Sequence, residues 1–117
     1  MGARSRRKGH RFELEVAALL TKATGLEHKR RLTEVREGNQ GDIETPLPLT
    51  VQCKVGARPN PAQALREAQQ AAPKGHHPVA ITRTNGAGKR PPTDTVTLPL
   101  EDFLEMLELL TRHGLWR

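Results

Sequence analysis

The sequence predicts one α/β domain in which a mixed β-sheet of about five strands is flanked by helices. Its 117 residues fit a single domain. Three stretches are typical of helices, and short runs rich in β-branched residues lie between them. No repeat and no second domain is visible. We therefore expect the order helix, two or three strands, helix, two strands, helix.

The first nine residues, MGARSRRKG, are basic and offer nothing to a hydrophobic core. We expect them to form an N-terminal arm ahead of a domain over residues 10–117. Two interpretations stay open: the arm is a solvated tail, or it contacts phosphates. The whole chain favours an anionic partner, because 19 Lys and Arg outnumber 13 Asp and Glu and the net charge is +6. Nucleic acid is the first candidate.

A helix is expected from His10, with Gly25 as its stop. Its apolar stripe follows steps of three and four residues and comprises Phe12, Val16, Leu19, Leu20 and Ala23. Glu13 and Glu15 flank this stripe on opposite sides. Periodicity alone does not choose between them as a functional carboxylate.

The strand pattern is strongest in LTVQCKV, which begins at Leu49. Gln52 and Lys54 should share one face of this strand, while Cys53 points to the other face and into the core. The short run DIET, which begins at Asp42, predicts a strand before it, and residues 26–35 predict a weaker one. The prolines between the two runs indicate a turn, so Asp42 and Gln52 fall on a predicted hairpin.

Punctuation residues define the remaining elements. Asn60 and Pro61 suit the N-cap and first position of a helix that Pro73 ends. Strands are expected in HPVAITRT and TVTLPL, and an amphipathic helix over residues 100–113. Leu115 and Trp116 follow that helix and are expected to pack on the domain or on a second subunit.

The location of the chain is constrained by its cysteine count and hydropathy. A single cysteine cannot form an internal disulfide, so a reducing cytoplasm is expected, with nucleoid association if DNA is the partner. No apolar run approaches the roughly 20 residues of a membrane span, and no signal peptide is visible. We expect no membrane partner.

Four polar residues form a candidate site: Glu13, Asp42, Gln52 and Lys54. Hydrolysis of a phosphodiester needs a hard cation held by oxygen ligands, and a positive group that orients water and steadies the developing charge. Asp42, the Gln52 amide and the Cys53 carbonyl offer such oxygens, and Glu13 is placed to assist through water. On spacing alone a simpler interpretation also stands, with Asp42 as a turn residue and Lys54 as a solvated charge.

These motifs resemble the PD-(D/E)xK nucleases, in which a carboxylate precedes an acid-x-lysine triplet on a β-hairpin. More specifically, RRKGHRFELEVAALL followed by GD and VQCK is similar to the archaeal-type Holliday junction resolvases. In that family a glutamate stands four residues after a glycine, which matches Gly9 and Glu13, not Glu15. The resemblance implies a restriction-endonuclease-like fold, with Asp42 as the family's aspartate and residues 52–54 as its triplet.

One position departs from the family pattern. Gln52 stands where the family usually has a glutamate, so an oxygen ligand is kept but one negative charge is lost. Metal affinity should fall, or another carboxylate should compensate. The resemblance implies a Mg²⁺ cofactor, for which Mn²⁺ substitutes, held by Asp42, Gln52 and the Cys53 carbonyl, with Glu13 acting through the metal or its water. It also implies that Lys54 positions the attacking water.

The expected function is resolution of four-way DNA junctions in recombination and repair by a homodimer, with products that carry 5′-phosphate and 3′-hydroxyl ends. Two alternatives stay open: another PD-(D/E)xK nuclease, of restriction or replication-repair type, and a non-catalytic basic DNA-binding module. The candidates for phosphate contacts are Arg4, Arg6, Arg7, Lys8, Arg11, Arg30, Arg31, Arg36 and Arg58.

Overall fold

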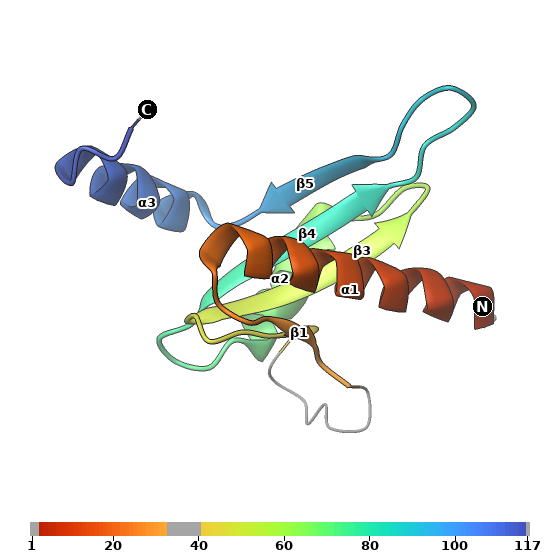
Figure 1. Ribbon diagram of the computed structural model, residues 1–117, viewed down its shortest axis with the longest axis horizontal. Coiled ribbons are helices and arrows are strands. Elements are labelled where there is room, and N and C mark those ends of the chain that lie inside the picture. Colours follow the sequence, from red (N-terminus) through yellow and green to blue (C-terminus); the bar gives the residue numbers. More distant parts are fainter. Residues whose placement is uncertain (1–2, 33–40, 117) are drawn as a thin grey trace.

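The computed structural model describes residues 3–32 and 41–116, and for residues 3–6 it describes the backbone alone. Within these residues, three helices and five strands follow one another in the predicted type and order (Figure 1). The helices are α1 (Ala3–Thr24), α2 (Pro61–Ala71) and α3 (Leu100–Arg112). The strands are β1 (Lys29–Arg30), β2 (Ile43–Glu44), β3 (Leu49–Gly56), β4 (His77–Thr84) and β5 (Thr93–Thr97).

The mixed α/β class is confirmed, but the described strands form two sheets instead of one sheet of five. β3 pairs with β4 in parallel and β4 with β5 antiparallel, whereas β1 and β2 form a separate antiparallel ladder. The chain after β2 reads TPLPL, and proline cannot donate a ladder hydrogen bond. β2 therefore stops after two residues, and it is joined to β3 through the hydrogen bond from the Asp42 N–H to the Val51 carbonyl.

The two faces of the three-stranded sheet are covered by different helices (Figure 1). On one face α1 inserts Phe12 and Val16 against Val51 and Cys53 of β3 and Ile43 of β2, and these side chains form the buried core. On the other face α2 buries small side chains, Ala64, Ala68 and Ala71. Because alanine projects so little, α2 can lie close to β3 and β4. This close approach positions the polar face of β3 beneath α2.

The predicted punctuation of α2 is confirmed. Asn60 accepts a hydrogen bond from the Gln63 N–H at 3.0 Å, and Pro61 occupies the first helical position. The helix ends at Ala71, ahead of Pro73. The predicted helix over residues 100–113 is also confirmed, as Leu100–Arg112. The start of α1 differs from prediction: α1 begins at Ala3 instead of His10, since the arginines and lysine before Gly9 are good helix formers.

The weak strand predicted over residues 26–35 is reduced to Lys29–Arg30, and residues 33–40 lie outside the described residues. TVTLPL contributes only its first three residues to β5, which begins earlier, at Thr93. Leu98 and Pro99 lead directly into α3, and Pro99 is its N-cap. No helix within the described residues is long and apolar enough to cross a membrane.

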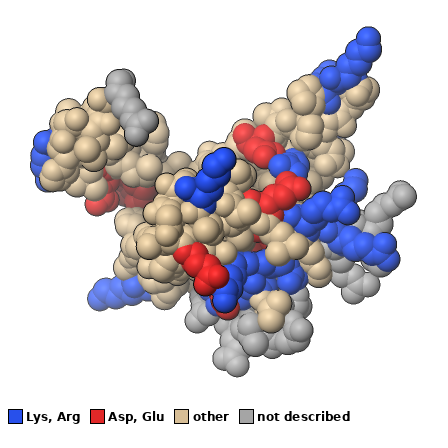
Figure 2. Space-filling model, in the orientation of Figure 1, with Lys and Arg blue, Asp and Glu red and all other residues tan. Residues whose placement is uncertain are grey.

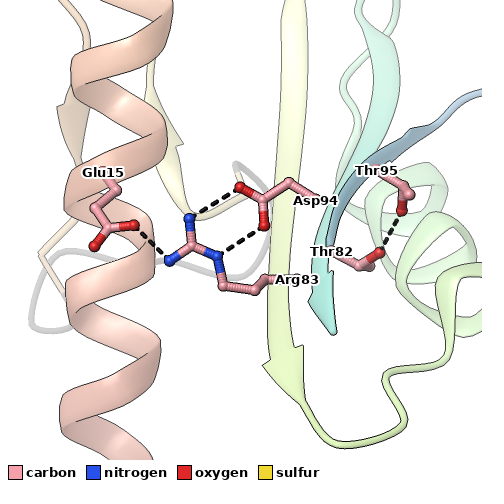
Figure 3. A network of polar contacts seen from close by, with 5 residues as sticks. All are labelled: Glu15, Thr82, Arg83, Asp94 and Thr95. Atoms are coloured by element: carbon pink, nitrogen blue, oxygen red, sulfur yellow. Dashed lines mark hydrogen bonds and ion pairs between the residues drawn. The ribbon is translucent and has the colours of Figure 1, made fainter. Parts of the chain in front are cut away.

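A polar cluster ties α1 to the far edge of the sheet (Figure 3). Arg83 of β4 lies between two carboxylates: its guanidinium binds Asp94 of β5 through two hydrogen bonds, at 2.7 and 2.9 Å, and Glu15 of α1 at 2.6 Å. The same guanidinium lies 4.8 Å from the centroid of the Phe12 ring. Glu15 thus serves the packing of α1 on the sheet.

Candidate active site

Asp42 is fixed at the edge of β3 by its backbone and its side chain. Its N–H donates to the Val51 carbonyl at 2.7 Å, and its carboxylate Oδ2 accepts from the Cys53 N–H at 2.8 Å. Asp42 is only 6% exposed. A charged acceptor so buried needs such a donor, because an unpaired carboxylate would be costly to desolvate.

Gly41 makes this approach possible. Its φ is +77°, and a Cβ there would lie 2.7 Å from the Val51 carbonyl oxygen and 3.0 Å from the Val51 nitrogen. Both contacts are with backbone, which cannot yield as a flexible side chain would. The pair GD is therefore explained by geometry: glycine permits the close approach, and the aspartate uses it. Sequence reasoning used Gly41 as part of the GD motif and gave it no structural role.

Gln52 and Lys54 share a face of β3, as predicted. The Lys54 Nζ lies 3.0 Å from Oε1 of Glu67 on α2, and the Gln52 Nε2 lies 3.5 Å from the same oxygen. Cys53 points the other way and is 8% exposed within the α1 core, so its prediction as a core residue is confirmed.

Glu13 approaches from the face of the sheet that α1 covers. It is 7% exposed, and its Oε1 accepts from the Arg30 Nε at 2.9 Å. Arg30 is paired with Ile43, the residue after Asp42, so Glu13 lies toward the Asp42 corner whereas Glu15 is turned to β4. The two glutamates therefore point to different neighbours, Glu13 to Arg30 and Glu15 to Arg83.

The four predicted residues do not all lie on one face. Val51 and Cys53 face α1, so the alternation of β3 directs Gln52 and Lys54 toward α2. Asp42 lies at the strand edge, between the face of Glu13 and the face of Gln52. A common ligand of all four side chains must therefore sit at this edge, beside the backbone of Cys53.

Asp42, Gln52 and the Cys53 carbonyl offer oxygen atoms of the kind that Mg²⁺ binds, although no three His, Cys, Asp or Glu side chains gather as a metal group within the described residues. The Gln52 Oε1 is shielded from solvent and has no hydrogen-bond partner in the described part of the chain. The Cys53 carbonyl points to the same edge as its N–H, because both groups of one strand residue point to one side. Mg²⁺ takes one or two carboxylates and other oxygens and keeps several waters.

The predicted phosphate contacts have different surroundings. Arg7, Lys8 and Arg11 are exposed on α1, and Figure 2 shows basic side chains gathered at the N-terminal end of this helix. Arg58 is exposed and lines a pocket of about 280 Å³ together with Lys54 and Glu67.

Arg30 and Arg31 are less accessible than sequence reasoning supposed. Their side chains are 13% and 15% exposed, and they form ion pairs with Glu13 and Glu44 at 2.9 and 3.9 Å. These ion pairs stabilise the β1–β2 ladder and leave little of either side chain on the surface. The side chains of Arg4 and Arg6, and Arg36 as a whole, lie outside the described residues.

Glu67 is the polar residue that sequence reasoning missed. A signal was present: Glu67 follows Ala64 by three residues and precedes Ala71 by four, so it lies on the helix face that those alanines turn to the sheet. What the pattern did not give was the register of α2 over β3.

Comparison with protein-family models, with curated proteins and with solved structures found no match to this chain. The similarity of its GD and QCK motifs to the resolvases is therefore a likeness of short sequence motifs.

Proposed function

We propose that the protein is a Mg²⁺-dependent, structure-selective endodeoxyribonuclease that resolves four-way DNA junctions. One observation carries the proposal: the Asp42 carboxylate accepts a hydrogen bond from the backbone N–H of Cys53. The neighbours of Cys53 on β3 are Gln52, whose amide oxygen has no hydrogen-bond partner within the described residues, and Lys54. Phosphodiester hydrolysis needs oxygen ligands for a metal ion and a positive group near the phosphate, and a carboxylate, an amide oxygen and a lysine can supply them.

Each residue has a role that follows from its position. Asp42, the Gln52 amide and the Cys53 carbonyl would hold the metal ion, and Glu13 would act through a bound water. The metal supplies charge neutralisation at the phosphate and a more acidic water. Lys54, which is partly exposed at the end of β3, orients the attacking water and steadies the charge that develops on the phosphate.

The surface charge supports DNA as the substrate. The net charge is +6, and the exposed cations Arg7, Lys8, Arg11 and Arg58 are available for phosphates. Such contacts release counterions from DNA, so they raise affinity without reading sequence. A substrate chosen by shape is consistent with this kind of surface.

The apolar surface supports a homodimer. No residue of α3 is buried within the described chain, and the exposed apolar side chains of this region include Leu100, Phe103, Leu104, Met106, Leu109, Leu115 and Trp116. Apolar patches of this kind mark interaction sites. A two-fold dimer would present two active sites to the two symmetric strands of a junction.

The test is incubation with labelled four-way junction, flap and linear duplex, with Mg²⁺ or with EDTA. We expect Mg²⁺-dependent cleavage of the junction at paired sites and little cleavage of the duplex. Duplex cut as fast as the junction would favour another PD-(D/E)xK nuclease. DNA binding without cleavage in Mg²⁺ or Mn²⁺ would favour a DNA-binding module.

A further inference from the structure

Glu67 is the described carboxylate that contacts both polar side chains of the β3 triplet. It approaches from α2, with its Oε1 3.0 Å from the Lys54 Nζ and 3.5 Å from the Gln52 Nε2. The side chain is 32% exposed, so it lies at the border of the pocket that Lys54 and Arg58 line. Two contacts from one oxygen place a negative charge where the strand itself carries none.

The contact with Gln52 favours one direction of its amide. A carboxylate only accepts hydrogen bonds, so it attracts the NH₂ end of an amide and repels the oxygen end. With Nε2 turned to Glu67, Oε1 must point away from it. That oxygen is shielded from solvent and lacks a hydrogen-bond partner among the described residues, so it can serve as a ligand to a cation.

The contact also bears on the charge that Gln52 does not supply. A glutamate at position 52 would bring its own negative charge to a metal at the β3 edge, whereas the amide brings only a dipole. Glu67 restores one negative charge beside the same two side chains, from a neighbouring helix. It also gives Lys54 a counter-charge, which holds the lysine against β3.

We infer that Glu67 is a positioning residue that compensates for Gln52: it turns the Gln52 oxygen toward the metal and supplies the missing negative charge. This inference rests on the proposed function, since it concerns the metal at Asp42. Outer carboxylates that orient metal ligands typically contribute a factor of about 10–100 to metal affinity.

The test is a double-mutant cycle on metal binding without DNA. Mn²⁺ binding is measured by the loss of the free-ion EPR signal for the wild type, Glu67→Gln, Gln52→Glu and the double variant. These proteins carry one, none, two and one carboxylate at the two positions. We expect Glu67→Gln to bind Mn²⁺ about 10–100-fold more weakly, Gln52→Glu to bind more tightly than wild type, and the double variant to return close to wild type.

Two controls separate this inference from the proposed function. Glu105→Gln removes an exposed carboxylate on α3 and should leave Mn²⁺ binding unchanged, and Asp42→Asn should abolish it. If Asp42→Asn abolishes binding while Glu67→Gln binds like wild type, Glu67 is not the compensating group and the metal site stands. If the wild type binds no Mn²⁺, or Asp42→Asn binds it normally, the metal site falls and the inference falls with it.

Discussion

At the scale of single residues, Asp42 and Lys54 are held by contacts that a sequence motif does not reveal. The Cys53 N–H binds the carboxylate of one, and Glu67 binds the ammonium of the other. Asp42→Asn keeps an acceptor for the Cys53 N–H but removes the charge, and Lys54→Met removes the cation. Each should reduce junction cleavage about 10²–10³-fold, as for the loss of one preorganised charge.

Binding of the junction, measured by fluorescence anisotropy in Ca²⁺, should remain near wild type in both variants. Glu44→Gln is the matched control, since it removes an exposed carboxylate close to Asp42 in the chain. It should cleave at the wild-type rate. Full activity of Asp42→Asn or Lys54→Met would remove the site from β3.

Gly41 offers a second prediction at this scale, with a built-in comparison. Gly25 and Gly41 both have positive φ, +73° and +77°, but a Cβ at Gly25 meets no atom within 4 Å. Gly25→Ala should lower the free energy of unfolding by about 1–2 kcal/mol through backbone strain alone. Gly41→Ala adds a clash with the β3 backbone and should lower it by about 2–5 kcal/mol.

Urea denaturation followed by circular dichroism measures both changes. Equal losses for the two variants would mean that β3 can move away from Gly41. A larger loss at Gly41, with cleavage also reduced in the folded variant, would tie the glycine to the placement of Asp42.

At the scale of elements, the sequence predicted the features that depend on neighbouring residues, such as helix caps and strand alternation. Asn60 and Pro61 specify the start of α2, and the alternation around Gln52 specifies which face of β3 is polar. The sheet could not be predicted in the same way. The two-residue strands β1 and β2 depend on a partner distant in sequence and on prolines that end the ladder, and the register of α2 over β3 placed Glu67.

The cluster of Glu15, Arg83 and Asp94 holds three elements together, because it joins α1, β4 and β5 (Figure 3). Lysine cannot reproduce the paired hydrogen bonds to Asp94 or the stacking over Phe12. Arg83→Lys should therefore lower the free energy of unfolding by about 1–2 kcal/mol, from partly exposed ion pairs and a cation–π contact. Arg66→Lys, an exposed change on α2, should change it by less than about 0.5 kcal/mol.

The same cluster gives a pH dependence with a definite sign. The hydrogen bonds from Arg83 lower the pKa of the Asp94 carboxyl below its usual value. The stabilisation is therefore present above the ordinary aspartate pKa of about 3.9, and it is lost as the pH falls below that value. In urea titrations from pH 7 to pH 2.5, the deficit of Asp94→Asn relative to wild type should shrink in this acidic range. A deficit that is constant with pH would show that the carboxylate charge contributes nothing.

At the scale of the whole molecule, the chain is more extended than its length requires. The radius of gyration is 14.9 Å, whereas a compact domain of this length has about 13 Å by the general size relation. α3 accounts for part of this, since it projects at one end of the sheet with its apolar side chains exposed (Figure 1). The amphipathic pattern predicted the helix, but its partner is not encoded within the helix itself.

We expect a second copy of the chain to cover α3. A stable interface buries roughly 1,200–2,000 Å² in total, and the exposed side chains of α3 with Leu115 and Trp116 offer a continuous stretch of sequence for it. Leu100→Gln combined with Leu104→Gln should convert the dimer to a monomer, as measured by light scattering at micromolar concentration. Glu108→Gln introduces the same side chain on the same helix without removing an apolar group, and should leave the mass unchanged.

The functional consequence distinguishes this dimer from a mere association of apolar surfaces. A single small domain has one active site, whereas a two-fold dimer aligns two sites with the two-fold axis of the junction. The monomeric double variant should therefore keep the metal site, bind Mn²⁺ as the wild type does, and nick one strand without paired cleavage. Paired cleavage by a proven monomer, or a wild type that is itself monomeric, would contradict the resolvase proposal. It would favour a nuclease that cuts one strand at a time.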